Sequence, residues 1–224
     1  MIAIVDYGIG NLGSVTKGFR FVGASTVLTG DPAVLAEADA LVLPGDGAFG
    51  ATMDEICGRG LADLLVSRAR AGTPLLGICI GMQVLFEESE EHGHNAGLGL
   101  LPGRVRRFFG PEGEAPRPPL PVPHMGWNRL RHRHDHPLLS GIAEGAHVYF
   151  VHSYYCDVPD DLVLSASDYG IDFPAIVARD NVLGMQFHPE KSQSVGLSLL
   201  RNFVRFVEER AAAPLSAVRE GGRA

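Results

Sequence analysis

The sequence predicts an α/β fold in which helices cover both faces of a mostly parallel central sheet, with an antiparallel extension. Short, continuous runs of Val, Ile and Leu alternate with helix-compatible stretches in the first half of the chain. Such runs between helices are typical of a parallel sheet that is buried on both faces. After Gly93 the apolar runs become shorter, and turn residues separate them. This change predicts the antiparallel extension.

The first half predicts four strands and three helices. Its continuous apolar runs predict buried strands over residues 2–6, 25–28, 40–45 and 74–79. Apolar residues at helical spacing predict helices over residues 12–22, 61–71 and 82–90. Gly72 ends the second of these helices, and Asp31 before Pro32 suits a further helix start.

The second half predicts six short strands and a closing helix. The strands cover residues 101–108, 127–131, 147–151, 163–167, 175–178 and 182–187. The proline-rich residues 111–123 predict an exposed loop, and residues 194–210 predict an amphipathic helix. We expect one domain over residues 1–210 and a flexible tail over 211–224, where no apolar periodicity continues the helix.

Composition narrows the possible functions. A chain of 224 residues is long enough for one substantial core. Its net charge of −7 argues against general nucleic-acid binding and against a polybasic membrane surface. No apolar run reaches the roughly 18 residues of a membrane span, and the N-terminus lacks the basic region of a signal peptide, so we expect a cytoplasmic protein. Three cysteines without zinc-like spacing predict no metal site.

A glycine motif near the N-terminus could indicate a dinucleotide site. Gly8, Gly10 and Gly13 match G-x-G-x-x-G after an apolar run. A dinucleotide fold also needs an acidic residue at the tip of its second strand, to hold a ribose. That tip reads Leu28-Thr29-Gly30 here. The motif therefore does not predict a nucleotide cofactor.

A nucleophile is predicted at Cys79. The run Gly77-Ile78-Cys79-Ile80-Gly81 lies between an apolar strand and a helix-compatible stretch. A sharp strand–nucleophile–helix turn of this kind needs small residues on either side of the nucleophile. The N-terminus of the following helix favours the thiolate. A buried structural cysteine is the alternative interpretation of this motif alone.

A base and an oxyanion hole complete the predicted chemistry. His188 follows the last predicted strand, and Glu190 stands two residues later, where it can orient the imidazole. The loop Leu43–Gly50 follows the third strand, so it emerges at the same sheet edge as Cys79. Its main-chain N–H groups and that of Ile80 could stabilise an oxyanion. Glycines within this loop would let its peptide flip between an active and an inactive orientation.

Together these motifs resemble the class I (triad) glutamine amidotransferases. The segments "DYGIGNLGSV", "LPGDGAFG", "GICIGMQVLFEESEE", "PHMGWN" and "FHPEKS" further resemble the glutaminase subunits of imidazole glycerol phosphate synthase, from Ile2 to about Val207. The resemblance implies that a cysteine thioester releases ammonia from L-glutamine without a metal or organic cofactor. It also implies a (β/α)₈-barrel cyclase partner that takes the ammonia and makes imidazole glycerol phosphate and aminoimidazole carboxamide ribotide in histidine biosynthesis.

The resemblance assigns four groups of residues. The catalytic residues are Cys79, His188 and Glu190; the oxyanion hole uses Gly45, Asp46 and Ile80; the substrate contacts are Gly47, Gln83, Glu91, Ser153 and Tyr154; the partner interface includes Asn11, Trp127, Asn128 and Lys191. Asp46 stands where many relatives carry a small apolar residue. If its main-chain N–H serves the hole, its side chain need not matter.

Three alternatives remain open at this point. The first is another triad amidotransferase, of anthranilate, aminodeoxychorismate or pyridoxal phosphate synthesis, which would lack "PHMGWN" and Lys191. The second is a non-catalytic scaffold, which would typically have lost the Cys or the His. The third is a cysteine peptidase, disfavoured by Gln83. The stretch "RHRHDHP" at residues 131–137 is interpreted as a solvated surface and not as a metal site.

Overall fold

One large sheet organises the chain in the computed structural model, which describes residues 1–109 and 120–212. Its strand order is β2-β1-β3-β4-β14-β13-β12-β9. The first five of these strands run parallel to one another, and the last three pair antiparallel. The bounds in that order are Thr26–Thr29, Ile2–Val5, Ala40–Gly45, Leu75–Cys79, Val182–Met185, Asp172–Arg179, Val163–Asp168 and Arg131–His132. The predicted α/β class is confirmed.

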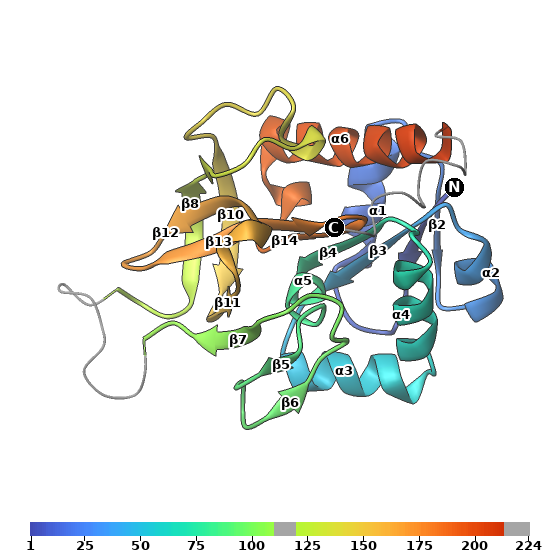
Figure 1. The fold of residues 1–224 in the computed structure, drawn as a ribbon, viewed down its shortest axis with the longest axis horizontal. Coiled ribbons are helices and arrows are strands. Elements are labelled where there is room, and N and C mark those ends of the chain that lie inside the picture. Colours follow the sequence, from blue (N-terminus) through green and yellow to red (C-terminus); the bar gives the residue numbers. More distant parts are fainter. Residues whose placement is uncertain (110–119, 213–224) are drawn as a thin grey trace, which may run out of the picture.

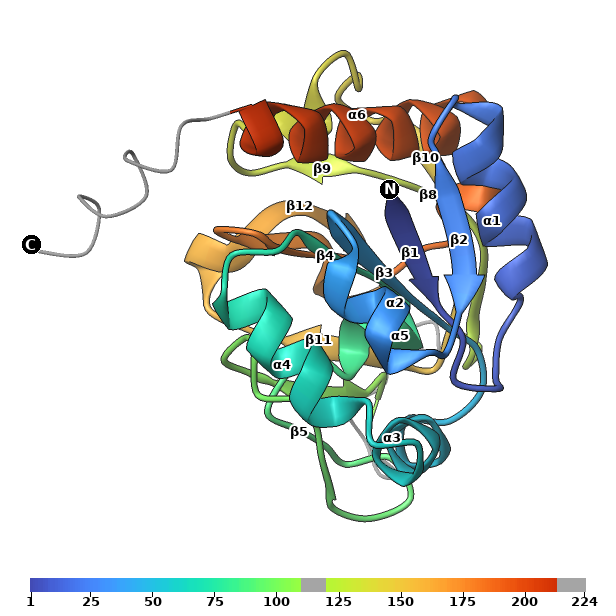
Figure 2. The ribbon, with the colours of Figure 1, turned by 90° about the vertical axis from the view of Figure 1, so that its right-hand side faces the viewer.

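Helices cover both faces of this sheet, as Figures 1 and 2 show. Helices α1 (Leu12–Phe21) and α6 (Gln193–Ala212) lie together on one face. Helices α2 (Pro32–Glu37), α3 (Phe49–Gly58) and α4 (Ala62–Arg70) lie on the other side. The start expected at Asp31 is confirmed, because the Asp31 side chain accepts the N–H of Ala33 at the N-cap of α2. Helix α3 was not predicted.

Two small sheets stand beside the large one. Strand β8 (His124–Arg129) pairs antiparallel with β10 (His147–His152). The other sheet has the order β11-β7-β5-β6, with bounds Tyr154–Asp157, Arg104–Arg107, Glu88–Ser89 and Asn95–Ala96. The predicted antiparallel extension is therefore only partly right. Strands β12, β13 and β9 extend the large sheet, whereas three of the predicted strands belong to the small sheets.

The helix predicted over residues 82–90 is wrong. Helix α5 covers only Ile80–Gln83, and the chain reaches strand β5 five residues later. The carbonyls of Val84, Leu85 and Phe86 accept hydrogen bonds from the returning segment 98–101 instead of from a continuing helix. Residues 84–86 are also completely buried, so this stretch has no polar face toward solvent. The long-range pairing overrides the local apolar pattern.

The ends of the chain and its proline-rich loop are only partly described. Helix α6 continues to Ala212, and the rest of the expected tail lies outside the described residues. Residues 110–119, which include most of the expected loop, also lie outside them. None of the helices in the two described ranges combines the length and the hydropathy that a membrane span requires.

Candidate active site

Three neighbouring parallel strands end at the same edge of the large sheet (Figure 1). Strands β3 and β4 are in a register that pairs Gly45 with Cys79. Strand β14 pairs Met185 with Ile78, so His188 follows three residues beyond that pair. The carboxyl ends of parallel strands in an open α/β sheet commonly hold the functional site. The topology thus gathers the predicted nucleophile, base and oxyanion loop.

The turn at Cys79 has the backbone of a nucleophile elbow. Cys79 has φ = +56° and ψ = −114°, a conformation that residues other than glycine rarely adopt. The flanking glycines are required by close approach. A Cβ at Gly81 would lie 1.7 Å from the carbonyl oxygen of Leu43, and one at Gly77 would lie 2.4 Å from that of Gly81. Helix α5 begins at Ile80, directly after the sulfur-bearing residue.

His188 and Glu190 form a buried pair. The Nδ1 of His188 lies 2.9 Å from Oε1 of Glu190, and both side chains are almost inaccessible to solvent. Because a carboxylate only accepts hydrogen bonds, Nδ1 must carry the proton, which leaves Nε2 to face the reaction. Pro189 between them begins the short 3₁₀ helix η3 (Pro189–Lys191), which fixes their separation.

This pair sets the charge of the imidazole. Burial lowers the pKa of His188, but the nearby Cys79 sulfur and the Glu190 carboxylate outweigh burial and raise that pKa to about 10. His188 is therefore protonated at neutral pH and places a positive charge near the Cys79 sulfur. The sequence prediction of a nucleophile, a base and an orienting acid corresponds to groups that the fold brings together.

The oxyanion loop differs in detail from what the sequence suggests. Gly47 has a positive φ of 96°, whereas Gly45 is a strand residue whose absent Cβ matters for packing. A Cβ there would lie 2.7 Å from the backbone nitrogen of Gly81. Gly45 is thus required by close approach and not by left-handed backbone geometry. A substitution at 45 would disturb the elbow before it affected any peptide flip.

The Asp46 side chain is engaged, contrary to the expectation that it need not matter. Its Oδ2 accepts the main-chain N–H of Asn11, at 2.8 Å. Its Oδ1 lies 3.8 Å from Nε2 of His188, on the opposite side of the ring from Glu190. The imidazolium therefore has a second carboxylate close to the nitrogen that must serve Cys79. Sequence motifs could not reveal this contact, because it depends on the loop's position.

A cavity of about 290 Å³ opens in front of Cys79. It is lined by Asp46, Gly47, Cys79, Ile80, Gln83, Glu91, Pro123, Val151, His152, Ser153 and Tyr154. Every residue predicted to contact the substrate is among them. Val151 and His152 belong to the segment "VHSYY" at residues 151–155, which the resemblance also places at the substrate pocket. Sequence reasoning missed Pro123.

Two polar side chains on the cavity wall are fixed by their partners. Gln83 donates through Nε2 to the carbonyl of Tyr154 and to Oε1 of Gln186, each at 3.1 Å. Its own Oε1 is buried and has no hydrogen-bond partner within the described part of the chain. Glu91 accepts the N–H of Phe49 at the N-terminus of helix α3, at 2.6 Å. These contacts fix the orientation of both side chains at the cavity wall.

Three of the four residues predicted at the partner interface are exposed. Trp127 on strand β8 is 48% exposed, and its ring meets the Tyr149 ring in an edge-to-face arrangement. Asn11 is exposed at the start of helix α1, where its side chain caps the helix through the N–H of Ser14. Lys191 is exposed at the end of η3, next to Glu190. Asn128 is different, because its amide points inward and donates to the carbonyl of Asp168 at 2.7 Å.

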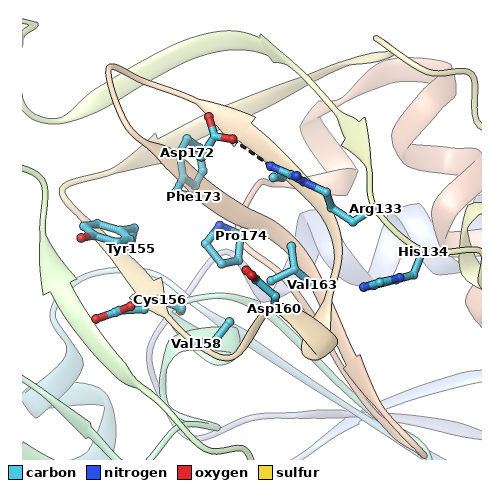
Figure 3. Close-up of a pocket in the computed structure, with 12 residues that line it drawn as sticks. Arg133, His134, Tyr155, Cys156, Val158, Asp160, Val163, Asp172, Phe173 and Pro174 are labelled. Atoms are coloured by element: carbon cyan, nitrogen blue, oxygen red, sulfur yellow. Dashed lines mark hydrogen bonds and ion pairs between the residues drawn. The ribbon is translucent and has the colours of Figure 1, made fainter.

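A larger cavity of about 420 Å³ lies elsewhere, between strands β11, β12 and β13 (Figure 3). Arg133 and Asp172 at its rim pair with one another at 2.8 Å, and Cys156 on its wall is fully buried. Burial raises the pKa of the Cys156 thiol, which makes it a poor nucleophile. The smaller cavity is the candidate active site, because Cys79, the predicted nucleophile, lies on its wall.

The histidine-rich stretch is only partly a solvated surface. His134 is exposed, as expected. His132 is half-buried on β9 and contacts the carbonyl of Ile142 at 3.1 Å. His136 is also half-buried, and its Nδ1 accepts the N–H of Leu138 at the start of the short helix η1 (Pro137–Leu139). Within residues 1–109 and 120–212, no group of three or more His, Cys, Asp or Glu side chains is arranged to hold a metal ion.

Comparisons with known proteins agree with this geometry. The model of the family described as glutamine amidotransferase class-I matches residues 3–206. A solved structure described as a glutamine amidotransferase superposes with a TM-score of 0.71 at 21% identity, covering 92% of this chain and 98% of that one. Another, described as a glutamine amidotransferase from Thermotoga maritima, gives 0.64 at 19% identity over 92% of this chain and 97% of its own. At these identities the two structures support the fold alone.

Relatives of higher identity narrow the family. The imidazole glycerol phosphate synthase subunit HisH of Geobacillus thermodenitrificans is 53% identical over 94% of this chain and 98% of its own length. The subunit of the same name from Salinibacter ruber is 50% identical over 100% of this chain and 98% of its own. The protein therefore belongs to the class I glutamine amidotransferases and, among them, to the HisH subunits of imidazole glycerol phosphate synthase.

Proposed function

We propose that the protein is the glutaminase of an imidazole glycerol phosphate synthase, hydrolysing L-glutamine to glutamate and ammonia. One observation carries this proposal. A protonated His188, held by Glu190, lies at the sheet edge beside the strained Cys79, and the adjacent cavity is of a size for one small amino acid. The names of the relatives favour this synthase over the anthranilate, aminodeoxychorismate and pyridoxal phosphate enzymes.

The chemistry would proceed in two steps. The Cys79 thiolate attacks the γ-carboxamide carbon of glutamine, and the His188 imidazolium gives its proton to the leaving nitrogen. The C–N bond breaks, ammonia departs, and a γ-glutamyl thioester remains on Cys79. A water molecule then attacks the thioester while His188 takes up its proton. Cleavage of the C–S bond releases glutamate and restores the thiolate–imidazolium pair, so neither a metal nor an organic cofactor is needed.

Main-chain groups would stabilise the oxyanion of both steps. The N–H of Ile80 follows the nucleophile and starts helix α5. The Gly45–Asp46 segment borders Cys79 from the neighbouring strand. Donors aimed at a developing oxyanion typically contribute about 10²–10³ in rate each. Their positions support Ile80 and the Gly45–Asp46 segment as the oxyanion hole.

The cavity wall suggests how glutamine is oriented. Gln83 lies on the wall of this cavity, where its carboxamide can help to hold the α-amino-acid end of the substrate. Glu91, although held by the N-terminus of helix α3, adds a negative charge at the same wall. Ser153 and Tyr154 line the same cavity, and their main-chain groups can meet the α-carboxylate.

The ammonia would pass to a second subunit. The relatives are named as subunits of a synthase, and we infer that the partner of this protein is a cyclase with a (β/α)₈-barrel fold. Trp127 and Lys191 are exposed and flank the segments that form the active site, which supports them as contact residues. A tryptophan at the centre of such a contact is a typical hot spot.

Replacement of the nucleophile tests the glutaminase function. In the complex with the cyclase subunit, Cys79→Ala should lower glutamine-dependent synthesis by at least about 10⁴-fold, because the covalent step is lost. Synthesis supported by ammonium salts should continue, because cyclisation takes place in the other subunit. Equal loss with both nitrogen sources would mean that Cys79 is structural.

Calorimetric titration of variants against the cyclase subunit tests the interface. Trp127→Ala should weaken association by about 2 kcal/mol or more, the typical size of a hot-spot effect, and Lys191→Ala by less. Phe21→Ala is a matched control, because Phe21 is also exposed, at 73%, but lies at the far end of helix α1. An affinity that neither substitution changes would remove both residues from the interface.

A further inference from the structure

Two buried histidines face one another across the small sheet that carries Trp127. Strands β8 and β10 pair His124 directly with His152, and Nδ1 of His124 lies 3.0 Å from Nε2 of His152. Both side chains are almost completely buried, at 3% and 5% exposure. Neither has a role in the chemistry described above. His152 ends strand β10 at the wall of the active-site cavity.

The pair is the centre of a longer chain of hydrogen bonds. On one side, Nδ2 of Asn128 lies 3.3 Å from Nε2 of His124. On the other side, Nδ1 of His152 lies 2.8 Å from the carbonyl oxygen of Tyr154. The same carbonyl accepts from Nε2 of Gln83 at 3.1 Å. These hydrogen bonds therefore connect strand β8, next to Trp127, with the Gln83 side chain on the wall of the active-site cavity.

The direction of every hydrogen bond in this chain is determined. A carbonyl only accepts, so Nδ1 of His152 donates to Tyr154. Burial lowers the pKa of His152 to about 3 and that of His124 to about 4, so both rings are neutral at pH 7 and each has one N–H. Nε2 of His152 must then accept from Nδ1 of His124. Nε2 of His124 in turn accepts from the amide of Asn128, which can only donate through Nδ2.

Aromatic rings enclose the two histidines and shield the hydrogen bonds between them from water. Tyr169 and Phe150 stack on His124, with ring centroids at 4.0 and 4.9 Å. Phe108 and Phe173 lie against His152, with centroids at 5.1 Å in both cases. In such surroundings an unmade hydrogen bond has no water to replace it, so each link is costly to lose.

The last hydrogen bonds of this series orient the Gln83 side chain. With His152 and Gln83 both donating to it, the Tyr154 carbonyl has both of its lone pairs occupied. The Gln83 amide nitrogen also donates to Oε1 of Gln186, which uses both of its protons. The nitrogen end of Gln83 is thereby fixed, and its buried oxygen end has no partner among residues 1–109 and 120–212.

We propose that His124 and His152 are positioning residues, which hold the Tyr154 carbonyl and, through it, the Gln83 carboxamide in the orientation that binds glutamine. The proposal rests on the glutaminase function, because Gln83 is assigned to substrate there. It gives the segment "PHMGWN" a second role. Trp127 in this segment is exposed, whereas His124 and Asn128 are connected to the cavity wall through the hydrogen bonds described above.

Kinetics of the complex with its cyclase subunit test this proposal. His124→Leu fills a similar apolar space but cannot donate to His152, and we expect the KM for glutamine to rise about tenfold while kcat changes less than about twofold. His124→Asn keeps a donor near the position of Nδ1 and should restore the KM to within about twofold. His134→Leu, at an exposed histidine, is the matched control and should leave the KM unchanged.

The KM separates positioning from damage to the fold. Partial unfolding removes active molecules and lowers the apparent kcat, but the KM of those that remain is unaffected. An unchanged KM in His124→Leu, with glutamate release intact in the unsubstituted complex, would overturn the positioning role and leave the glutaminase function standing. If the unsubstituted complex released no glutamate, the proposed function itself would fail.

The tautomers provide a readout that does not depend on activity. Long-range ¹H–¹⁵N spectra of the full chain at pH 7 should show both His124 and His152 neutral and protonated at Nδ1, with assignment by the signals that each single Asn variant loses. Protonation of His152 at Nε2 would contradict the deduced polarity, and with it the proposal.

Discussion

Among the described residues, two sites contain buried histidines, and the imidazole is protonated in one site and neutral in the other. His188 lies at the end of the parallel strands, between a carboxylate and a cysteine sulfur, and its pKa is raised to about 10. His124 and His152 lie in the small antiparallel sheet, among aromatic rings and neutral acceptors, and their pKa values are lowered to about 4 and 3.

Burial alone does not explain the difference, because all three side chains are at most 5% exposed. The hydrogen-bonding group next to each imidazole decides whether that imidazole is charged. An anion within hydrogen-bond distance compensates the imidazolium for lost hydration, whereas a carbonyl or a second neutral ring does not. One region thus holds a proton ready for transfer. The other uses neutral rings, whose fixed donor and acceptor ends give a hydrogen-bond chain its direction.

Removing the Glu190 carboxylate should abolish the difference in protonation between His188 and the two neutral histidines. This substitution has the largest expected effect. In Glu190→Gln the His188 imidazolium loses its buried counter-charge, so its pKa should fall, and glutamine hydrolysis should decrease by about 10³–10⁴-fold, as when the orienting acid of a triad is lost. Histidine NMR titration from pH 5 to 10 and glutamate release measure the two effects. If His188 in the variant titrated as in the unsubstituted chain, Glu190 would not be the source of its charge.

Acid should destabilise the protein through the neutral pair. The folded chain keeps His124 and His152 neutral down to about pH 4, while the unfolded chain protonates them near pH 6.5. Their contribution to stability is present above pH 6.5 and is lost as the pH falls. The two protons that this pair takes up on unfolding should contribute about 2.7 kcal/mol per pH unit to the decrease in the free energy of unfolding between pH 6 and 4.5.

Urea denaturation at several pH values checks this slope. His124→Asn removes one titrating group, so its slope should be smaller by about 1.4 kcal/mol per pH unit, whereas the exposed His134→Asn should keep the full slope. His188 contributes nothing in this window, because it is protonated in both states. Its raised pKa stabilises the folded chain at neutral pH, and that contribution is lost as the pH rises from 6.5 through about 10. A slope that His124→Asn did not alter would place the acid sensitivity elsewhere.

The smallest expected effect concerns the second carboxylate at His188. Asp46 keeps a negative charge 3.8 Å from Nε2, where it opposes both the thiolate and the oxyanion. Asp46→Asn keeps the shape and can still accept the N–H of Asn11, so glutamate release by the isolated chain should rise about three- to tenfold. Asp54→Asn, an exposed acid on helix α3, is the control. A rate that fell in Asp46→Asn would mean that the carboxylate assists the reaction.

The proposed triad could be recognised in the sequence because its geometry leaves local signatures. The glycines around Cys79 are dictated by contacts within one strand–helix turn, and His188 and Glu190 are only two residues apart. The parallel strands were predictable for a similar reason, since full burial imposes continuous apolar runs on 2–5 and 40–45.

The remaining features depend on pairing between distant segments. The pattern of residues 82–90 is compatible with a helix, and only the hydrogen bonds from residues 98–101 prevent one. His124 and His152 are 28 residues apart and meet through the register of two strands. The Asp46 contact depends on where the loop containing Asn11 lies. None of these arrangements has a spacing that sequence reasoning could recognise.

The left-handed backbone at Cys79 has a consequence for the protein's history. A side chain at φ = +56° and ψ = −114° carries a conformational penalty on the order of 1–3 kcal/mol, from which glycine would be largely exempt. The backbone here would therefore favour a residue without a side chain. If the activity were no longer needed, replacement of Cys79 by glycine would meet no resistance from stability.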